Sequence, residues 1–469
     1  MQTRHGVIMK WRRIAWGVLA AAVLSSGLAQ AQEAISLEEA YTLALKNSPQ
    51  IKAQHYSTAF AQAQVSEAKY YWAPKFSLKS QFGPMPRVTD ETQTENDIWS
   101  NFFDSWGFTT RNSLEMWMPL FTSMKVYHTH ELAKIGLEVE NLREQNEVLN
   151  VQFDVARAYY GLQLAVAAQD VLKEAEDYVA RIEREYEKLM ASNDPSVKET
   201  DRYRIDIAKS NLFRVKAQIA SSWQYAEQAL SVHTRLPLPI VVQEMDFSAD
   251  SAVLRDLPSV MEMARRYRGD LALLARAEEA ADLQAKIQWL QWWPDLVLAA
   301  EVNYRYSNAV PELTVDNFFI KDSYNGYGFA IGFVLRWNLD PVQQVFRVRQ
   351  ADAKADQMRQ RRLLATAGIE LEVNKNYHET VQALKNVEIT KASRRSAKRF
   401  LTYELLQYEA GQGNVNDLIS ALTTFIEQRS IYLTVLHDFR VSLVRLQKVV
   451  GVPDVDMLIE RYSAETLDE

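Results

Sequence analysis

The sequence contains no cysteine among its 469 residues. Disulfide bonds, thiolate metal sites and a lipid anchor on an N-terminal cysteine are therefore excluded. Beyond residue 31 there is no run of 18 apolar residues, so we expect no transmembrane helix there. Positive charge is not in excess either. The formal charge is −7, and it becomes −11 without the four basic residues of segment 1–31. Nucleic-acid binding needs a basic surface, so we expect no nucleic-acid partner.

The usual motifs of catalytic chemistry are also missing. The sequence has no glycine-rich phosphate loop, no G-x-S-x-G elbow and no H-E-x-x-H. His128 and His130 are two residues apart, which places them on different faces of a helix, so we expect no metal site. We therefore expect neither an enzyme nor a cofactor. Nothing in the sequence indicates a site that could hydrolyse ATP.

The first 31 residues have the pattern of a signal peptide. Arg4, Lys10 and two further arginines form a basic region, and the apolar segment Ile14–Leu24 is too short to span a bilayer as a helix. Ala29-Gln30-Ala31 provides a small-x-small cleavage site. We expect an exported mature chain that starts near Gln32.

Proline is scarce in two long stretches. None occurs between Pro119 and Pro195 or between Pro341 and Pro453, and glycine is rare in both stretches. Proline interrupts helix interiors, so helices of roughly 60–70 residues, about 90–105 Å long, are permitted. The sequence therefore predicts an elongated molecule.

The two halves of the chain resemble each other. Leu37–Phe82 aligns with Leu257–Val302 at a constant offset, and Trp72-Ala73-Pro74 matches Trp292-Trp293-Pro294. Further along the two halves, Asp201 matches Asp417. The pattern predicts an internal duplication. We divide the chain into a signal peptide (1–31), a first repeat (32–237), a linker (238–256), a second repeat (257–453) and a C-terminal tail (454–469).

Each repeat has the same predicted order of elements. A first helix, about Ser36–Tyr71 or Leu257–Trp292, ends at a proline. Two strands and then two long helices follow. Ser36 and Glu39 have the spacing of a capping box at the start of the first helix.

The predicted strands show the alternation of a membrane β-barrel. Segments 296–306 and 327–337 alternate large apolar residues with small or polar ones, whereas 76–82 and 110–118 do so more weakly. A half-buried strand of a soluble sandwich has the same period. Aromatic residues near the strand ends favour the membrane, as in an interfacial belt facing outer-membrane lipid. The tryptophans are Trp72, Trp117, Trp292, Trp293 and Trp337.

Four strands cannot close a barrel, and an open edge is not tolerated in lipid. Several copies must therefore share one barrel, and either a dimer or a trimer would close it. The long helices carry apolar residues at coiled-coil spacing, with Arg429 as a charged interruption in 418–450. An ordinary helix-bundle core would show the same local pattern.

Several segments resemble the TolC-like outer-membrane efflux protein family. Residues 35–49 are similar to its N-terminal signature, and Pro119-Leu120-Phe121 to its strand-to-helix motif. Residues 156–160 are similar to its helix pattern, and Tyr408 through Asp417 to its second helix–turn–helix tip.

The resemblance implies a homotrimer with a twelve-stranded barrel, and a helical tunnel that reaches a periplasmic adaptor and an inner-membrane pump. The family closes its periplasmic tips through Tyr, Arg and Asp, which implies gate roles for Tyr408, Asp417 and its repeat mate Asp201. Gly413 stands where the family carries the Arg. An acid at the start of a helix is also explained by capping and the helix dipole. The implied adaptor-docking tips comprise Asn193, Asp194, Pro195, Gly411, Gly413 and Asn414.

The expected fold is therefore mainly α with a small β part, a duplicated long-helix α-barrel with four membrane strands that contribute to a shared trimeric β-barrel. The expected function is the passive exit duct of a tripartite efflux or type I secretion system in the outer membrane of a Gram-negative bacterium. An exported structural coiled-coil protein that never enters the membrane is the first alternative. A lectin-like or enzymatic barrel is the second.

Overall fold

The computed structural model describes residues 34–87, 106–192, 198–245, 253–310, 322–410 and 412–460. The predicted signal peptide lies outside these residues, as do Asn193, Asp194, Pro195 and Gly411 of the predicted tips. Helices dominate and one four-stranded sheet accompanies them, so the predicted fold class is confirmed. Within the described residues, no helix is both long and apolar enough to cross a membrane.

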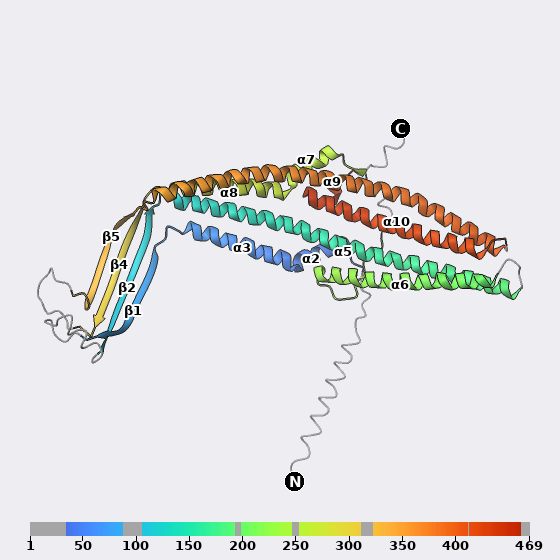
Figure 1. The fold of residues 1–469 in the computed structure, drawn as a ribbon, viewed down its shortest axis with the longest axis horizontal. Helices are drawn as coiled ribbons and strands as arrows, with labels where there is room; N and C mark the ends of the chain where they lie inside the picture. Colours follow the sequence, from blue (N-terminus) through green and yellow to red (C-terminus); the bar gives the residue numbers. More distant parts are fainter. Residues whose placement is uncertain are drawn as a thin grey trace, which may run out of the picture. The chain divides into compact units, whose positions relative to one another are not determined.

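Two compact units make up the chain. The strand unit comprises Gln54–Glu144 and Gly269–Gly368, and the helical unit comprises Met1–Ala53, Gln145–Arg268 and Ile369–Glu469. Figure 1 labels the main helices and strands along the chain. The elements follow in sequence order. They are α2 (Leu37–Asn47), α3 (Pro49–Lys69), β1 (Lys75–Pro86), β2 (Trp106–Phe121), α5 (Lys125–Ala191), α6 (Glu199–Thr234), β3 (Val253–Leu254), α7 (Leu257–Tyr267), α8 (Gly269–Leu290), β4 (Asp295–Ser307), β5 (Gly326–Arg336), α9 (Pro341–Glu409), α10 (Val415–Val450), η2 (Val455–Leu458) and β6 (Ile459–Glu460).

Two helices have the length that the proline-free stretches permit. Helix α5 has 67 residues and α9 has 69. Pro341 occupies the first position of α9, where its missing N–H costs no helical hydrogen bond. The next helix in each repeat is shorter, and α6 and α10 both have 36 residues.

The predicted single helix at the start of each repeat is wrong, because each is split in two. Helix α2 ends at Asn47, and Ser48 leaves the helical region (ψ 125°) before Pro49 begins α3. The ring of a proline clashes with a helical conformation of the preceding residue, which explains this break. In the second repeat Arg268 is extended (ψ 111°) between α7 and α8, and Gly269 follows it. The predicted capping box is confirmed, since Ser36 N–H donates to Glu39 Oε2 (2.8 Å) and Glu39 N–H to Ser36 Oγ (3.1 Å).

The sheet has the strand order β1-β2-β4-β5, and every neighbouring pair is antiparallel. Figure 1 shows the four strands side by side. Strands β1 and β2 extend beyond the segments predicted from alternation, since β1 continues through Gly83, Pro84 and Pro86. Proline is tolerated there because Pro84 and Pro86 lie among the last three residues of a strand at the edge of this sheet, where a missing N–H removes few ladder hydrogen bonds.

The core of the helical unit consists of several apolar clusters along the long helices. One cluster lies where α5 meets α6 and α9 meets α10, and includes Ile205, Leu401, Val415 and Leu418. Another packs α2 against α5 and α6 around Leu162 and other buried residues. Strands β3 and β6 pair with each other beside the remaining clusters. Apolar packing therefore holds the α5–α6 and α9–α10 hairpins together within this unit.

Candidate functional site

The two faces of the sheet differ in chemistry. Strand register places twelve large apolar side chains, contributed by all four strands, on one face of the sheet, and all twelve are exposed. They are Phe76, Leu78, Phe82, Leu114, Val302, Tyr304, Tyr306, Tyr327, Phe329, Ile331, Phe333 and Leu335. Tyr327 is 90% exposed and Phe333 is 73% exposed. A contiguous exposed apolar surface of this kind marks a contact with lipid or with another protein.

The opposite face of the sheet is polar and charged. Lys79 Nζ lies 2.8 Å from Glu115 Oε1, on the neighbouring strand. Asn303 Nδ2 donates to Glu301 Oε1 (3.5 Å). From Gly326 to Gly332, glycine and alanine alternate with the apolar side chains of β5, so this part of β5 adds little bulk to the polar face. The sheet is thus apolar on one side and hydrophilic on the other, as the alternation predicts.

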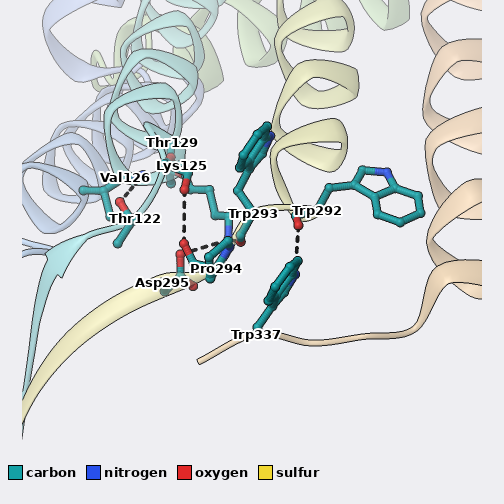
Figure 2. A network of polar contacts seen from close by, with 10 residues as sticks. Thr122, Lys125, Val126, Thr129, Trp292, Trp293, Pro294, Asp295 and Trp337 are labelled. Atoms are coloured by element: carbon teal, nitrogen blue, oxygen red, sulfur yellow. Dashed lines mark hydrogen bonds and ion pairs between the residues drawn. The ribbon is translucent and has the colours of Figure 1, made fainter. Parts of the chain in front are cut away.

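A network of polar contacts fixes the turn from β2 into α5 (Figure 2). Lys125 Nζ donates to Asp295 Oδ1 (2.9 Å) and to the carbonyl of Trp293 (2.8 Å), so α5 is tied to the start of β4. The turn itself is strained, because Ser123 and Met124 have φ values of 50° and 67°. The Lys125 side chain is 12% exposed. A charged hydrogen bond at so little exposed a side chain contributes more to the stability of the fold than an ion pair on the surface.

The predicted interface tryptophans occupy two kinds of position. Trp72, Trp292, Trp293 and Trp337 lie at the junctions of helices and strands, and the Trp337 indole N–H donates to the Trp292 carbonyl (3.0 Å; Figure 2). All four are at least partly exposed. Trp117 lies instead within β2, on the polar face, with the Arg336 guanidinium 5.3 Å from its ring centre.

The predicted gate residue Asp201 caps a helix. It is the third residue of α6 and is 5% exposed. Its carboxylate accepts hydrogen bonds from the Lys198 backbone N–H (2.9 Å) and from Arg204 Nη1 (3.0 Å). Asp417 is likewise the third residue of α10 but is exposed. The Asp417 N–H donates to Asn414 Oδ1 (2.9 Å), and its carboxylate accepts from Asn414 Nδ2 (2.5 Å).

Tyr408 lies in the same cluster as Ile205 and Leu418 and is 2% exposed. Burial, with the nearby carboxylates of Asp201 and Glu185, raises the pKa of Tyr408 to about 12. Its hydroxyl has no hydrogen-bond partner among the described residues. The structure therefore brings Tyr408 and Asp201 together.

Gly413 closes the turn between α9 and α10. Its N–H donates to the Gln407 carbonyl (3.0 Å), and so does the N–H of Gln412 (2.9 Å). A Cβ at Gly413 would lie 2.8 Å from the Tyr408 backbone nitrogen and 3.1 Å from the Gln407 carbonyl carbon. The glycine at this position is thus explained by the close approach of the turn to the last turn of α9.

One charged pair within the helical unit was not assigned a function from the sequence. Arg429 of α10 forms an ion pair with Glu174 of α5. Both line a cavity of about 390 Å³ together with Asp170, Arg394 and other residues. Burial lowers the pKa of Arg429. The charged interruption in the apolar spacing of α10 was the signal that could have located the pair. Among the described residues, no group of His, Asp or Glu side chains could hold a metal ion.

Comparison with known proteins shows what this chain is similar to. Residues 40–192 match the model of the outer membrane efflux protein family. The predicted resemblance is confirmed. No curated protein matches the chain in sequence.

Solved outer-membrane channels share the fold over nearly the whole chain. The CmeC outer membrane channel of Campylobacter jejuni has a TM-score of 0.68 at 16% identity, covering 92% of this chain and 93% of that one. VceC, an outer membrane protein of Vibrio cholerae, has a TM-score of 0.65 at 17% identity and coverages of 88% and 96%. The open state of the Neisseria gonorrhoeae MtrE outer membrane channel has a TM-score of 0.66 at 16% identity, with 88% of each chain covered.

Proposed function

We propose that this protein is the outer-membrane exit duct of a tripartite efflux or type I secretion system, and that its four strands form part of a shared barrel. The observation that carries the proposal is the two-faced sheet, with exposed apolar side chains on one face and charged ones on the other. A membrane barrel needs lipid-facing apolar residues and tolerates a polar lumen. Both the family match and the shared fold support the same function.

Closure of the barrel supports a homotrimer. The outer edges of β1 and β5 have no strand partner among the described residues. Unpaired strand edges are not tolerated in lipid, so neighbouring copies would pair β5 of one chain with β1 of the next. Three copies of the four-stranded sheet would form a barrel of about twelve strands, within the range of bacterial barrels.

Cell fractionation tests the proposal. We expect a heat-resistant oligomer in the outer-membrane fraction that carbonate does not extract, and loss of efflux when the gene is deleted. A protein that carbonate washes off would be an exported structural coiled-coil protein and would refute the duct. Full resistance of a deletion strain to every substrate of the partner pump would do so as well.

For the partners, we propose that the α5–α6 and α9–α10 tips dock onto a periplasmic adaptor, which links the duct to an inner-membrane pump. The proposed docking residues are Asn193, Asp194, Pro195, Gly411, Gly413 and Asn414. The exposed side chain of Asn414 supports this role for the second tip. The chain has no native cysteine, so an Asn414→Cys variant carries a unique thiol for crosslinking. A crosslink to an adaptor in cells supports docking, whereas equal labelling from Lys52→Cys, an exposed position on α3, would count against it.

For the gate, we propose that Asp201, Asp417 and Tyr408 help to hold the tips closed. The buried Asp201 carboxylate beside Tyr408 supports the proposal, because loss of its charged hydrogen bonds would loosen the start of α6. Replacing both aspartates by Ala should raise the conductance of single channels in planar bilayers. An unchanged closed-state conductance would remove these residues from the gate and leave them as helix caps.

A further inference from the structure

Two register pairs on the polar face of the sheet join charged residues of like sign, whereas Asp295 and Arg336 at the end of the strands are partners of opposite sign. Glu115 of β2 is the direct register partner of Glu301 of β4. Four residues along the same strands, Arg111 is the direct partner of Arg305. All four side chains lie on the polar face of the sheet, because they alternate along each strand with the side chains of the apolar face.

This arrangement opposes sheet stability. Like charges directly opposite each other on neighbouring strands are destabilising, whereas opposite charges stabilise a sheet. Exchanging the residues at 301 and 305 would convert both rows into attractive Glu–Arg pairs. The chain instead keeps the signs apart by four residues, about 13 Å along an antiparallel strand.

Local contacts compensate only part of this repulsion. Lys79 pairs with Glu115 at 2.8 Å, which leaves Glu301 as the main source of negative charge in its row. In the basic row, Arg305 Nη1 donates to the Ser323 carbonyl (3.3 Å). The Nε of Arg305 and the Oδ1 of Asn303 are buried atoms without a hydrogen-bond partner among the described residues. Water or a solute at this face would satisfy both.

We propose that these rows form two charged rings of opposite sign in the lumen of the shared barrel. The acidic ring (Glu115 and Glu301) concentrates organic cations, and the basic ring (Arg111 and Arg305) concentrates organic anions, so a permeating solute meets both in succession. The inference rests on the proposed duct, because it requires the polar face to line the lumen. The acidic row lies toward the helix junctions, and the basic row lies toward Trp106 and Ser307 at the other end of the strands.

Strand β1 offers a matched pair of reporters. Ser77 is the register partner of Glu115, and Gln81 is the partner of Arg111. Both lie on the polar face, and neither carries charge. Ser77→Cys and Gln81→Cys each introduce the only thiol in the chain. Each purified oligomer is treated with a cationic trimethylammonium-ethyl methanethiosulfonate and with the anionic sulfonatoethyl reagent, and the two modification rates are measured.

We expect the cation-to-anion rate ratio to be about tenfold higher at Ser77→Cys than at Gln81→Cys, as for a unit charge a few ångströms away. Adding Glu115→Gln and Glu301→Gln should lower the ratio at position 77 and leave it almost unchanged at position 81. Equal ratios at the two positions, with both thiols reactive, would overturn the charged rings and leave the duct intact.

A control thiol on the apolar face distinguishes a failure of the charged-ring proposal from a failure of the proposed duct. Ser80 of β1 lies on the lipid-facing side of the sheet in the proposed barrel. In liposomes, Ser80→Cys should react with neither charged reagent. A reactive thiol at position 80, with unreactive thiols at 77 and 81, would mean that the polar face does not line a lumen. That result would refute both the duct and the rings.

Discussion

Gly413 allows the sharpest test of the turn between α9 and α10. In the Gly413→Ala variant, the new Cβ would lie 2.8 Å from the Tyr408 nitrogen and 3.1 Å from the Gln407 carbonyl carbon. Both contacts are with backbone atoms, so a rotamer change cannot relieve them. The same turn holds two N–H groups on the Gln407 carbonyl, and a shift large enough to admit the methyl group would lengthen these hydrogen bonds.

The size of the effect follows from the contacts. Overpacking against a rigid neighbour costs about 1–3 kcal/mol. A Gly→Ala change also lowers the conformational entropy of the unfolded chain, which stabilises the folded state by about 0.4–1 kcal/mol. We therefore expect the tip to lose about 1–2 kcal/mol, which raises the population of the open turn by a factor of roughly 5–30. Hydrogen–deuterium exchange of the peptide that spans residues 404–418 measures this opening directly.

Gly368 provides the matched control. It lies within α9, and a Cβ there would meet nothing within 4 Å. Gly368→Ala should stabilise its helix by about 0.5–1 kcal/mol, because glycine is unfavourable in a helix interior. Unchanged or slower exchange at the tip of Gly413→Ala would refute the reasoning.

Three other substitutions probe contacts that the structure defines. Lys125→Met should lower the free energy of unfolding by about 1.5–3 kcal/mol, because the Asp295 carboxylate loses a charged hydrogen bond in a sheltered site; thermal unfolding followed by circular dichroism measures it. Between about pH 10 and pH 12 the folded protein keeps the Tyr408 proton while the unfolded chain releases it, so the free energy of unfolding falls as pH rises. Tyr408→Phe removes this titration and should make that fall smaller. Arg429→Met alone leaves the Glu174 carboxylate without its partner, whereas the Arg429→Met, Glu174→Met double variant removes both charges. The single variant should therefore be less stable than the double variant by about 1 kcal/mol, as measured by denaturant titration.

Each of these tests has an outcome that contradicts it. Lys134→Met removes an exposed ion pair within one turn of α5 and should change stability little, so an equal effect at positions 125 and 134 would argue against the junction network. Tyr203 is 61% exposed, and a Tyr203→Phe variant with the same alkaline behaviour as Tyr408→Phe would rule out burial as the cause. A double variant less stable than Arg429→Met would show that Glu174 contributes independently of Arg429.

The sequence predicts the secondary structure well where a local pattern has a single physical cause. The first long stretch without proline corresponds to α5, the second to α9 and α10, and the alternating segments correspond to the strands. The split of each first helix was missed. The apolar pattern continues across Ser48 and Arg268, so periodicity alone does not show the break, although Pro49 was a local signal for the first.

The candidate gate shows why spacing alone does not define a site. Asp201 and Asp417 are repeat mates and occupy the same helical position. Asp201 is nevertheless buried beside Tyr408 and paired with Arg204, whereas Asp417 is exposed and bonded to Asn414. Their difference arises from side chains on other turns and helices, which the duplication does not reveal.

By itself, the sequence determined which residues alternate along each strand and where helices can run without interruption, because both depend on covalent geometry and on neighbours a few residues away. Only the tertiary structure decided which strands pair and in which register, and the register places Glu115 opposite Glu301 and Arg111 opposite Arg305. It also brought the turn at Gly413 against the backbone of α9. Contacts between distant segments depend on how the whole chain packs, and a shift of one residue would turn each side chain to the other face of the sheet.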